Sequence, residues 1–497
     1  MDTFQLLMNG FATALQPQHL LFCVIGCFLG TLIGVLPGIG PAGGTAMLIP
    51  VTFVLDPTDS IIMLAGIYYG AMYGGTITSV LVNVPGEAAS AITCVEGYQM
   101  AKKGRAGPAL TIAAIGSFIG GTVATFGLVL LALPLTRLAL MFGPPEFFAL
   151  MVLGLSLVTG LAGKSLVRAM ISAILGLMVA MVGIDPVMGV PRFTFGSIDL
   201  LSGFNIVPVA MGVFGIGEIL LSTESEVKAV IETKLSNLWL TVQDMKDSVR
   251  SIIRGTGIGF FLGLIPGIGA IIPTFISYVA EKKFSKNPET FGTGRIEGVA
   301  GPETANNAYA NAAMIPLFTL GIPGSPTIAI LMGAFMMNGL IPGPFLFIEH
   351  SAFVWAVIAS FYIGNVVLVI MNLPMIPLWV KVLKVPPAIL NTFIISFCVI
   401  GAYSLSNSVF DVGAMLGWGI LGYIFKKLDI PLTPLILTLI LGPMMERGLR
   451  QSLEMSQGDI SILFTRPISA ALLALAAILI IGTTLRIATK VKGETQL

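Results

Sequence analysis

Charged residues are scarce in this chain. Only 10% of its 497 residues are Asp, Glu, Lys or Arg, against roughly a quarter in soluble domains. Hydrophobic residues make up 55%, and the mean hydropathy is +0.95. The net charge of +1 gives no basic surface for nucleic acid. The composition therefore predicts a polytopic membrane protein.

Basic residues are absent from the first 101 positions. A cleavable signal peptide needs a basic n-region, so we expect the N-terminal segment to be retained. The first basic cluster is Lys102-Lys103-Gly104-Arg105. The positive-inside rule places this cluster in the cytoplasm.

Histidine and cysteine are also rare, with two and four residues. His19 and His350 stand at the ends of apolar runs, which indicates interfacial positions. Cys23 and Cys27 would share a helix face, but thiols at this spacing in a membrane helix indicate packing rather than metal ligation. We therefore expect no metal site. A membrane enzyme would need convergent His, Asp or Cys groups, and an ATP-driven pump would need a G-x-x-x-x-G-K-[ST] phrase, so we expect neither.

Long apolar segments recur along the whole chain. Each needs about 20 residues to span a bilayer as a helix, and the segments do not alternate with the period of two that a barrel demands. We expect about 10–13 membrane elements. Several of them are short or interrupted by Gly and Pro.

Two apolar segments carry the same seven-residue phrase. It reads Gly34-Val35-Leu36-Pro37-Gly38-Ile39-Gly40 in the first half and Gly263-Leu264-Ile265-Pro266-Gly267-Ile268-Gly269 in the second. Paired Pro/Gly breaks at matching places in two halves of a hydrophobic chain are typical of secondary transporters, whose sites are built from broken helices. The alternative is that the phrases only kink helices for close packing.

A second pair of breaks follows the first. Val84-Pro85-Gly86-Glu87 in the first half matches Ile322-Pro323-Gly324-Ser325 in the second, which indicates two repeats of roughly 90 residues. Basic residues end the first repeat (Lys102 to Arg105), whereas in the second they fill the first loop, between Lys282 and Arg295. This reversal predicts inverted topology.

The fold class expected is an all-α polytopic membrane protein with two inverted repeats that contain broken or re-entrant helices. The predicted organisation is transport repeat 1 (15–110), scaffold helices (111–222), a charged interfacial connector (223–254), transport repeat 2 (255–345) and further scaffold helices (346–490).

The broken segments are the candidate substrate site. Irregular backbone at membrane depth leaves N–H and C=O groups free for a ligand, and helix N-termini favour anions. The candidate substrate-binding residues are Gly38, Gly40, Thr45, Gly267, Gly269, Thr274, Ser325 and Thr327.

Polar residues near the breaks are candidates for a coupling cation. The densest polar cluster runs from Gly301 to Asn311, and Thr304, Asn307 and Asn311 fall on one helix face. Hydrogen bonds between helices could equally explain this face. Glu87 is a candidate proton- or Na⁺-linked carboxylate or an ordinary acid at a helix start. The cation-coupling set is Asn83, Glu87, Asn307 and Asn311.

The motifs resemble those of the large membrane subunit of the tripartite tricarboxylate transporter family. The resemblance rests on the Gly-x-x-Pro-Gly-Ile-Gly phrase, on the run from Glu297 to Ala308 and on the run from Thr319 to Ser325, and it extends from about residue 5 to residue 485. It implies a permease of the bacterial inner (cytoplasmic) membrane. Its expected partners are a small four-helix membrane subunit and a periplasmic solute-binding protein.

The resemblance also implies symport of tricarboxylates or related organic anions, driven by a Na⁺ or H⁺ gradient with no other cofactor. In the expected mechanism the binding protein delivers the anion to a site between the repeats, which then move as a rigid body against the scaffold. The alternatives are a stand-alone permease without an obligatory binding protein and a channel.

Overall fold

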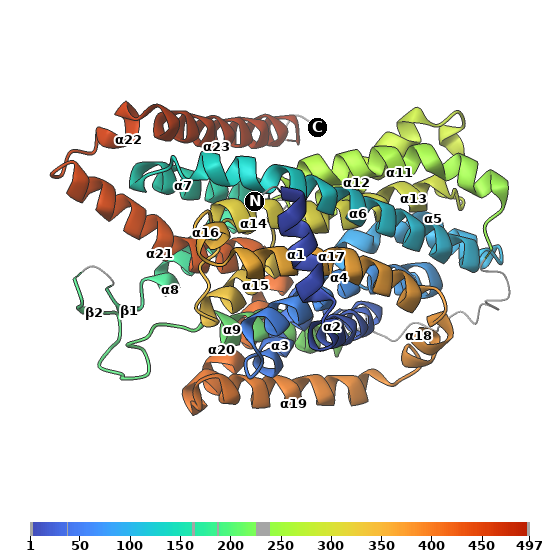
Figure 1. Cartoon of the computed structure of the whole chain (residues 1–497), viewed down its shortest axis with the longest axis horizontal. Helices are drawn as coiled ribbons and strands as arrows, with labels where there is room; N and C mark the ends of the chain where they lie inside the picture. The colour runs from blue at the N-terminus through green and yellow to red at the C-terminus, as the bar shows by residue number, and fades with distance from the viewer. Residues whose placement is uncertain (1–2, 37, 162–164, 186–187, 225–238, 495–497) are drawn as a thin grey trace.

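The computed structural model describes residues 3–36, 38–161, 165–185, 188–224 and 239–494, and this part of the chain is almost wholly helical (Figure 1). Seven helices of the described residues are long and apolar enough to cross a membrane: α2, α4, α6, α17, α19, α20 and α21. Five shorter apolar helices accompany them. The predicted all-α polytopic class is confirmed.

The first repeat consists of helices separated by short irregular segments. α1 (Thr3–Ala14) precedes the predicted repeat. In chain order the helices of the repeat are α2 (Pro17–Val35), α3 (Gly40–Thr52), α4 (Pro57–Val82), the 3₁₀-helix η1 (Ala88–Ala91) and α5 (Thr93–Lys102).

The second repeat also consists of helices separated by short irregular segments, but its 3₁₀-helix lies in the first loop and two helices precede its second break. In chain order its elements are α11 (Val242–Gly263), α12 (Ile271–Phe284), the short η3 (Pro288–Thr290), α13 (Glu297–Ala312), α14 (Met314–Leu320) and α15 (Pro326–Met337). The predicted boundary between connector and repeat 2, at 254/255, falls inside α11, and residues 225–238 of the connector lie outside the described residues.

The remaining elements form the scaffold. Between the repeats lie α6 (Ala106–Ala139), α7 (Pro144–Leu161), α8 (Leu166–Ala180), α9 (Ile206–Ala210), the π-helix η2 (Met211–Ile216) and α10 (Gly217–Ser222). After repeat 2 come α16 (Leu346–Glu349), α17 (Ser351–Asn372), α18 (Ile376–Val382), α19 (Pro387–Ser406), α20 (Val409–Lys427), α21 (Leu432–Met455), α22 (Ile462–Thr465) and α23 (Pro467–Glu494).

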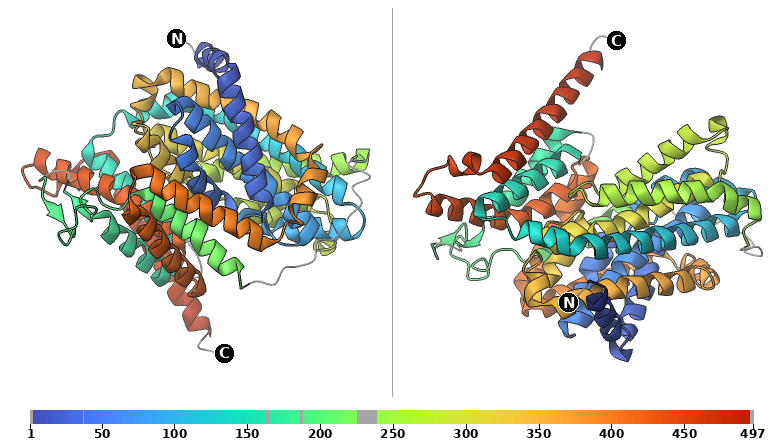
Figure 2. Two further views of the ribbon diagram at one scale, coloured as in Figure 1. Left: turned by 90° about the horizontal axis from the view of Figure 1, so that it is seen from below. Right: turned by 45° about the horizontal axis from the view of Figure 1, so that its top comes forward.

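The only strands of the described residues form a two-stranded antiparallel ribbon. β1 (Gly183–Ile184) pairs with β2 (Pro191–Arg192), and Gly183 lies opposite Arg192. The ribbon lies at one end of the molecule, near α8, while α23 extends away from the body toward the C-terminus (Figures 1 and 2).

Small residues at four-residue spacing join the first two long helices of each repeat. In α2 a Cβ added at Gly30 would come within 2.3 Å of the carbonyl oxygen of Ile67 in α4. In α11 a Cβ added at Gly259 would come within 2.3 Å of the carbonyl oxygen of Ala305 in α13. This packing resembles the small-xxx-small contacts of membrane helices. Gly30 and Gly259 each precede the break of their own repeat at the same distance along the sequence.

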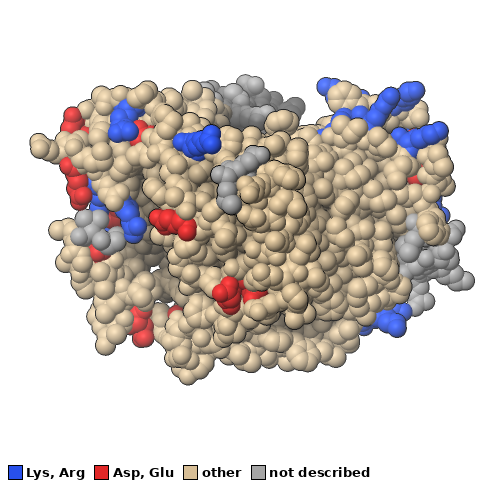
Figure 3. All heavy atoms as spheres, viewed as in Figure 1, with Lys and Arg blue, Asp and Glu red and all other residues tan. Residues whose placement is uncertain are grey.

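Basic segments from the two repeats meet on one face of the molecule. The Nζ of Lys103 donates a hydrogen bond to the carbonyl oxygen of Thr293 at 2.5 Å, and Arg105 forms an ion pair with Asp244 at the start of α11. The end of repeat 1 therefore lies beside the first loop of repeat 2, and the inverted topology stays a prediction. Figure 3 shows Lys and Arg gathered over the region of α11 and α12, next to a broad surface without charged side chains.

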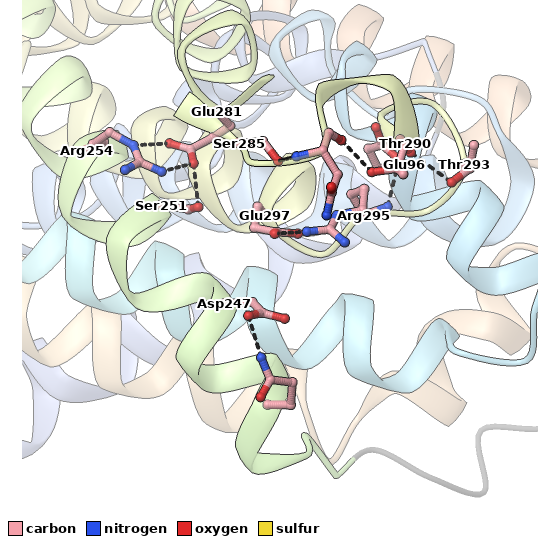
Figure 4. Close-up of polar contacts among 12 residues, drawn as sticks. Glu96, Asp247, Ser251, Arg254, Glu281, Ser285, Thr290, Thr293, Arg295 and Glu297 are labelled. Atoms are coloured by element: carbon pink, nitrogen blue, oxygen red, sulfur yellow. Dashed lines mark hydrogen bonds and ion pairs between the residues drawn. The ribbon is translucent and has the colours of Figure 1, made fainter. Parts of the chain in front are cut away.

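A buried carboxylate fixes this junction. Glu96 of α5, which is fully buried, accepts hydrogen bonds from the backbone N–H groups of Gly292, Gly294 (2.7 Å) and Arg295 (2.8 Å) and from the hydroxyl of Tyr278 (2.9 Å). Figure 4 shows Glu96 beneath the loop that joins α12 to α13. Repeat 1 thereby holds a loop of repeat 2.

Candidate functional site

The duplicated phrases are breaks between helices, as predicted. α2 ends at Val35 and α3 begins at Gly40, while α11 ends at Gly263 and α12 begins at Ile271. The two glycines of each phrase have left-handed backbone, with φ of 98° and 65° at Gly38 and Gly40 and of 81° and 71° at Gly267 and Gly269. Only glycine adopts such angles without strain, which explains why both repeats have glycine there.

The second breaks also match in conformation. The residue that caps the end of α4 is Asn83, with φ 56°, and the residue that caps the end of α14 is Gly321, with φ 69°. Asparagine is among the few residues that tolerate this region, so Asn83 has a local structural role as the cap of α4. Its side chain is exposed, and its part in cation binding stays a prediction.

The breaks of the second repeat are tied to one another. The carbonyl oxygen of Gly324 accepts hydrogen bonds from the backbone N–H of Gly267 (3.1 Å) and from the hydroxyl of Tyr309 (2.8 Å). Each repeat also packs on the other, because η1 contacts α12 and α13 while α15 contacts α3 and α4. The two repeats therefore interlock around their breaks.

A cavity of about 680 Å³ lies beside the first-repeat breaks, and we call it the Gly38 cavity. It is lined by residues 38–42, 85–88 and 429–432, by Pro326 and Thr327 and by Phe214, Glu218, Leu221 and Lys426. Three helices, α3, α15 and α21, begin at its wall. The first-turn N–H groups of a helix lack intrahelical partners and carry partial positive charge, so the cavity is suited to an anion.

Polar side chains line the same cavity. Lys426, at the end of α20, forms an ion pair with Glu218 of α10. Thr327 is 4% exposed. Ser325 does not line the cavity, but it caps α15 beside the cavity by accepting a hydrogen bond from the N–H of Ile328 at 3.3 Å. Of the predicted substrate residues, the cavity thus brings Gly38, Gly40 and Thr327 together.

A second cavity, of about 750 Å³, lies at the other end of α15 and beside the middle of α21. We call it the Arg447 cavity. It is lined by the C-terminal half of α15 (Met332 to Met337), by Phe410 and Asp411 at the start of α20 and by Pro443, Met444 and Arg447 of α21. α20 has 19 residues and is therefore about 28 Å long. The two cavities thus lie on opposite sides of the contact between repeats and scaffold.

Two buried carboxylates lie where the repeats meet. Glu87, 6% exposed, accepts a hydrogen bond from the Nδ2 of Asn306 at 2.6 Å. Glu303, 1% exposed, accepts hydrogen bonds from the hydroxyls of Thr76 (2.6 Å) and Thr93. Neither carboxylate forms an ion pair with a described residue. Glu303 was not predicted from the sequence, although an acidic residue in the interior of a helix was the available signal.

Other predicted site residues lie away from both cavities. The Nδ2 of Asn307 donates to Ser117 Oγ of α6 at 2.7 Å, and the Oδ1 of Asn311 accepts from Thr125 of the same helix at 3.1 Å. These contacts are the interhelical hydrogen bonds that were the alternative for this face. A cation role for Asn307 and Asn311 stays a prediction.

The remaining predicted residues lie in the first break of repeat 2 or in the helices that follow the first break of each repeat. Thr274 donates a hydrogen bond to the carbonyl oxygen of Ile271 at 2.8 Å within α12. Thr45 of α3 is fully buried, and its hydroxyl has no hydrogen-bond partner among the described residues. Gly267 and Gly269 lie on neither of the two cavities described above. A substrate role for these four residues stays a prediction.

The described residues contain no group of three or more His, Cys, Asp or Glu side chains that could hold a metal ion. The fold and its breaks define a multi-pass membrane protein with the duplicated, interrupted helices of a transporter. Residues 20–437 match the model of the tripartite tricarboxylate transporter TctA family. The chain belongs to this family, and its predicted membership is confirmed.

Two relatives come from Agrobacterium vitis. The chain is 48% identical over 475 residues, 95% of each sequence, to the "Uncharacterized 52.8 kDa protein in TAR-I ttuC' 3'region". It is 48% identical over 223 residues to the "Uncharacterized protein in TAR-II ttuC' 3'region", an alignment that covers 45% of this chain and 92% of the relative. No solved structure matches the chain.

Proposed function

We propose that this chain is the large permease subunit of a secondary transporter that imports tricarboxylates or related organic anions across the bacterial inner membrane. The observation that carries the proposal is the Gly38 cavity, where three helix N-termini and Lys426 line one space beside a duplicated break. Helix N-termini and a lysine together favour carboxylates. Membership of the tripartite tricarboxylate transporter TctA family supports tricarboxylates as the class of substrate.

The two cavities support alternating access. They lie at opposite ends of α15 and α20 and border the start and the middle of α21, so the proposed substrate path runs along the contact between α15 of repeat 2 and the scaffold helices. Movement of the interlocked repeats against α20 and α21 would close one cavity and open the other. In this scheme Gly38, Gly40, Ser325 and Thr327 bind the substrate, and the scaffold stays fixed.

Glu87 and Glu303 are the proposed coupling residues. An ionised carboxylate buried without a counter-charge is strongly unfavourable, so each group must be protonated or accompanied by a cation. Glu87 also lines the Gly38 cavity, which places one carboxylate where substrate binding can influence it. The coupling ion in this proposal is Na⁺ or H⁺, without another cofactor.

The family name describes a tripartite system, and we propose two partners. A small four-helix membrane subunit completes the membrane part, and a periplasmic solute-binding protein delivers the anion. The substrate spectrum then depends largely on the binding protein, because it selects what reaches the permease.

Reconstituted uptake tests the proposal. Proteoliposomes would contain this chain and the small membrane subunit, with labelled citrate, tricarballylate or succinate as probes, imposed Na⁺ or proton gradients, and the binding protein present or absent. The proposal predicts uptake that needs both the binding protein and one gradient. Gradient-driven uptake without the binding protein would instead indicate a stand-alone permease, and flux without any gradient coupling would indicate a channel.

A further inference from the structure

Two adjacent lysines at the end of α20 have different surroundings. Lys426 pairs with Glu218, and both side chains are largely buried, at 24% and 19% exposure. Lys427 pairs with Glu224, and these side chains are 45% and 43% exposed. Lys426 and Glu218 line the Gly38 cavity, whereas Lys427 and Glu224 do not. Lys426 therefore forms an ion pair at the cavity, whereas its neighbour Lys427 forms one at the surface.

Lys426 is the only basic side chain among the described residues that line the Gly38 cavity. The cavity also contains the carboxylates of Glu87, Glu218 and Asp429. Asp429 is exposed and pairs with Arg168 at 3.5 Å, and Glu87 accepts its hydrogen bond from Asn306. Glu218 is therefore the carboxylate that forms the ion pair with Lys426.

Glu218 also lies against the first break. A Cβ added at Gly38 would come within 3.4 Å of Glu218 Oε1, so this carboxylate lies close to the residues that lead into α3. Glu218 follows the π-helix η2 directly, and π-turns inside helices are frequent at functional sites. The position of Glu218, between a lysine and a helix N-terminus, is one that a carboxylate of an organic anion would favour.

We propose that Lys426 binds a carboxylate of the transported anion, and that Lys426 forms its ion pair with Glu218 when the cavity holds no substrate. Substrate binding then exchanges one carboxylate partner of Lys426 for another. The inference rests on the proposed function, because it assigns a residue to recognition of the organic anion. It extends that function by naming an internal competitor, which keeps the lysine paired in the absence of substrate and lowers the apparent affinity.

The test is the KM of citrate uptake in the reconstituted system for single and double variants. Lys426→Gln removes the substrate contact, so KM rises roughly 10-fold or more, the size expected for loss of a charge-assisted hydrogen bond. Glu218→Gln keeps the lysine and removes its competitor, so KM falls. Lys427→Gln and Glu224→Gln are the matched controls, and their KM stays at the wild-type value.

The double variant Glu218→Gln/Lys426→Gln shows whether Lys426 binds the substrate or only neutralises Glu218. If Lys426 only neutralised Glu218, replacing both charges would restore the wild-type KM, which would overturn the inference. We expect the double variant to remain as impaired as Lys426→Gln. Lys426→Arg, which keeps the charge, supplies a second variant if Lys426→Gln does not insert, and its uptake should stay within a few-fold of wild type, in line with a retained charge pair.

The role of Lys426 and the proposed transport function can be contradicted separately. Wild-type uptake of citrate with an unchanged KM in Lys426→Gln, or an unchanged or higher KM in Glu218→Gln, contradicts the role of Lys426 and leaves the proposed function standing. Absence of wild-type uptake for citrate, tricarballylate and succinate under both gradients contradicts the proposed function and the role of Lys426 together.

Discussion

Asn306 of the second repeat donates a hydrogen bond to Glu87 of the first, with 2.6 Å between Nδ2 and Oε1. Both side chains are buried. Glu87 follows the second break of repeat 1 and lines the Gly38 cavity. A single contact therefore joins the cavity to α13, the helix that also carries Glu303. Through this hydrogen bond, a change at the cavity can reach the helix that carries the second buried carboxylate.

Glu303→Gln should uncouple transport from its gradient. The amide keeps the size of the carboxylate but can neither be ionised nor exchange a proton, so we expect gradient-driven uptake to fall about 10-fold or more, as for other general proton-transfer or charge-binding groups. Glu349→Gln, in the exposed α16 to α17 turn, is the control. Wild-type gradient dependence in Glu303→Gln would contradict a coupling role.

Glu96→Gln should destabilise the junction between the repeats. One oxygen of the carboxylate becomes an NH₂ group that cannot accept from the backbone N–H groups of the 285–296 loop, so we expect a loss of roughly 2 kcal/mol or more. Thermal unfolding in detergent measures the effect. Glu289→Gln, at an exposed position of the same loop, should unfold as wild type does, and equal melting of the two variants would refute the anchoring role.

Gly259→Ala should weaken the packing of α11 on α13. The new Cβ would lie 2.3 Å from the carbonyl oxygen of Ala305, and forced helix separation typically costs about 1–3 kcal/mol. Two residues earlier, a Cβ at Gly257 would meet no described atom within 4 Å, so Gly257→Ala should be neutral or slightly stabilising. Thermal unfolding of the two variants compares them directly, and similar melting temperatures would contradict close packing at Gly259.

Cysteines placed in the two cavities should react from opposite sides of the membrane. Ala88, exposed in the Gly38 cavity, and Ile341, 70% exposed in the Arg447 cavity, provide the positions. The basic cluster Lys102 to Arg105, which follows Ala88 in repeat 1, predicts labelling of Ala88→Cys from the cytoplasm. The other cavity should then open to the opposite side, so Ile341→Cys should be labelled from the periplasm. A membrane-impermeant thiol reagent gives the readout, with the wild-type chain as background. Labelling of both variants from one side would contradict the two-cavity path.

The sequence predicted the features that depend on local backbone. The breaks at Gly38 and Gly267 follow from glycine and proline in apolar runs, because such residues interrupt helices regardless of their neighbours. The reversal of loop charge predicted inverted repeats, and the contact of Lys103 with Thr293 agrees with that arrangement. Each of these signals lies within a short stretch of the sequence.

The features missed depend on contacts between distant segments. Lys426 and Glu218 are separated by 208 positions in the sequence, and nothing in the sequence around either residue indicates the other. His19 looked interfacial, yet its Nδ1 lies 2.5 Å from Oδ1 of the buried Asp59. The face that carries Asn307 could be recognised as a polar face, but its partner helix could not be inferred from spacing alone.

The measurement that tests the central claim most directly is a structure of the membrane complex determined with a transported carboxylate bound. The account predicts the anion in the Gly38 cavity, with carboxylates at the starts of α3 and α15 and at Lys426, and with Glu218 displaced from the lysine. An anion bound elsewhere in a transport-competent complex, with the Lys426–Glu218 pair intact, would contradict it.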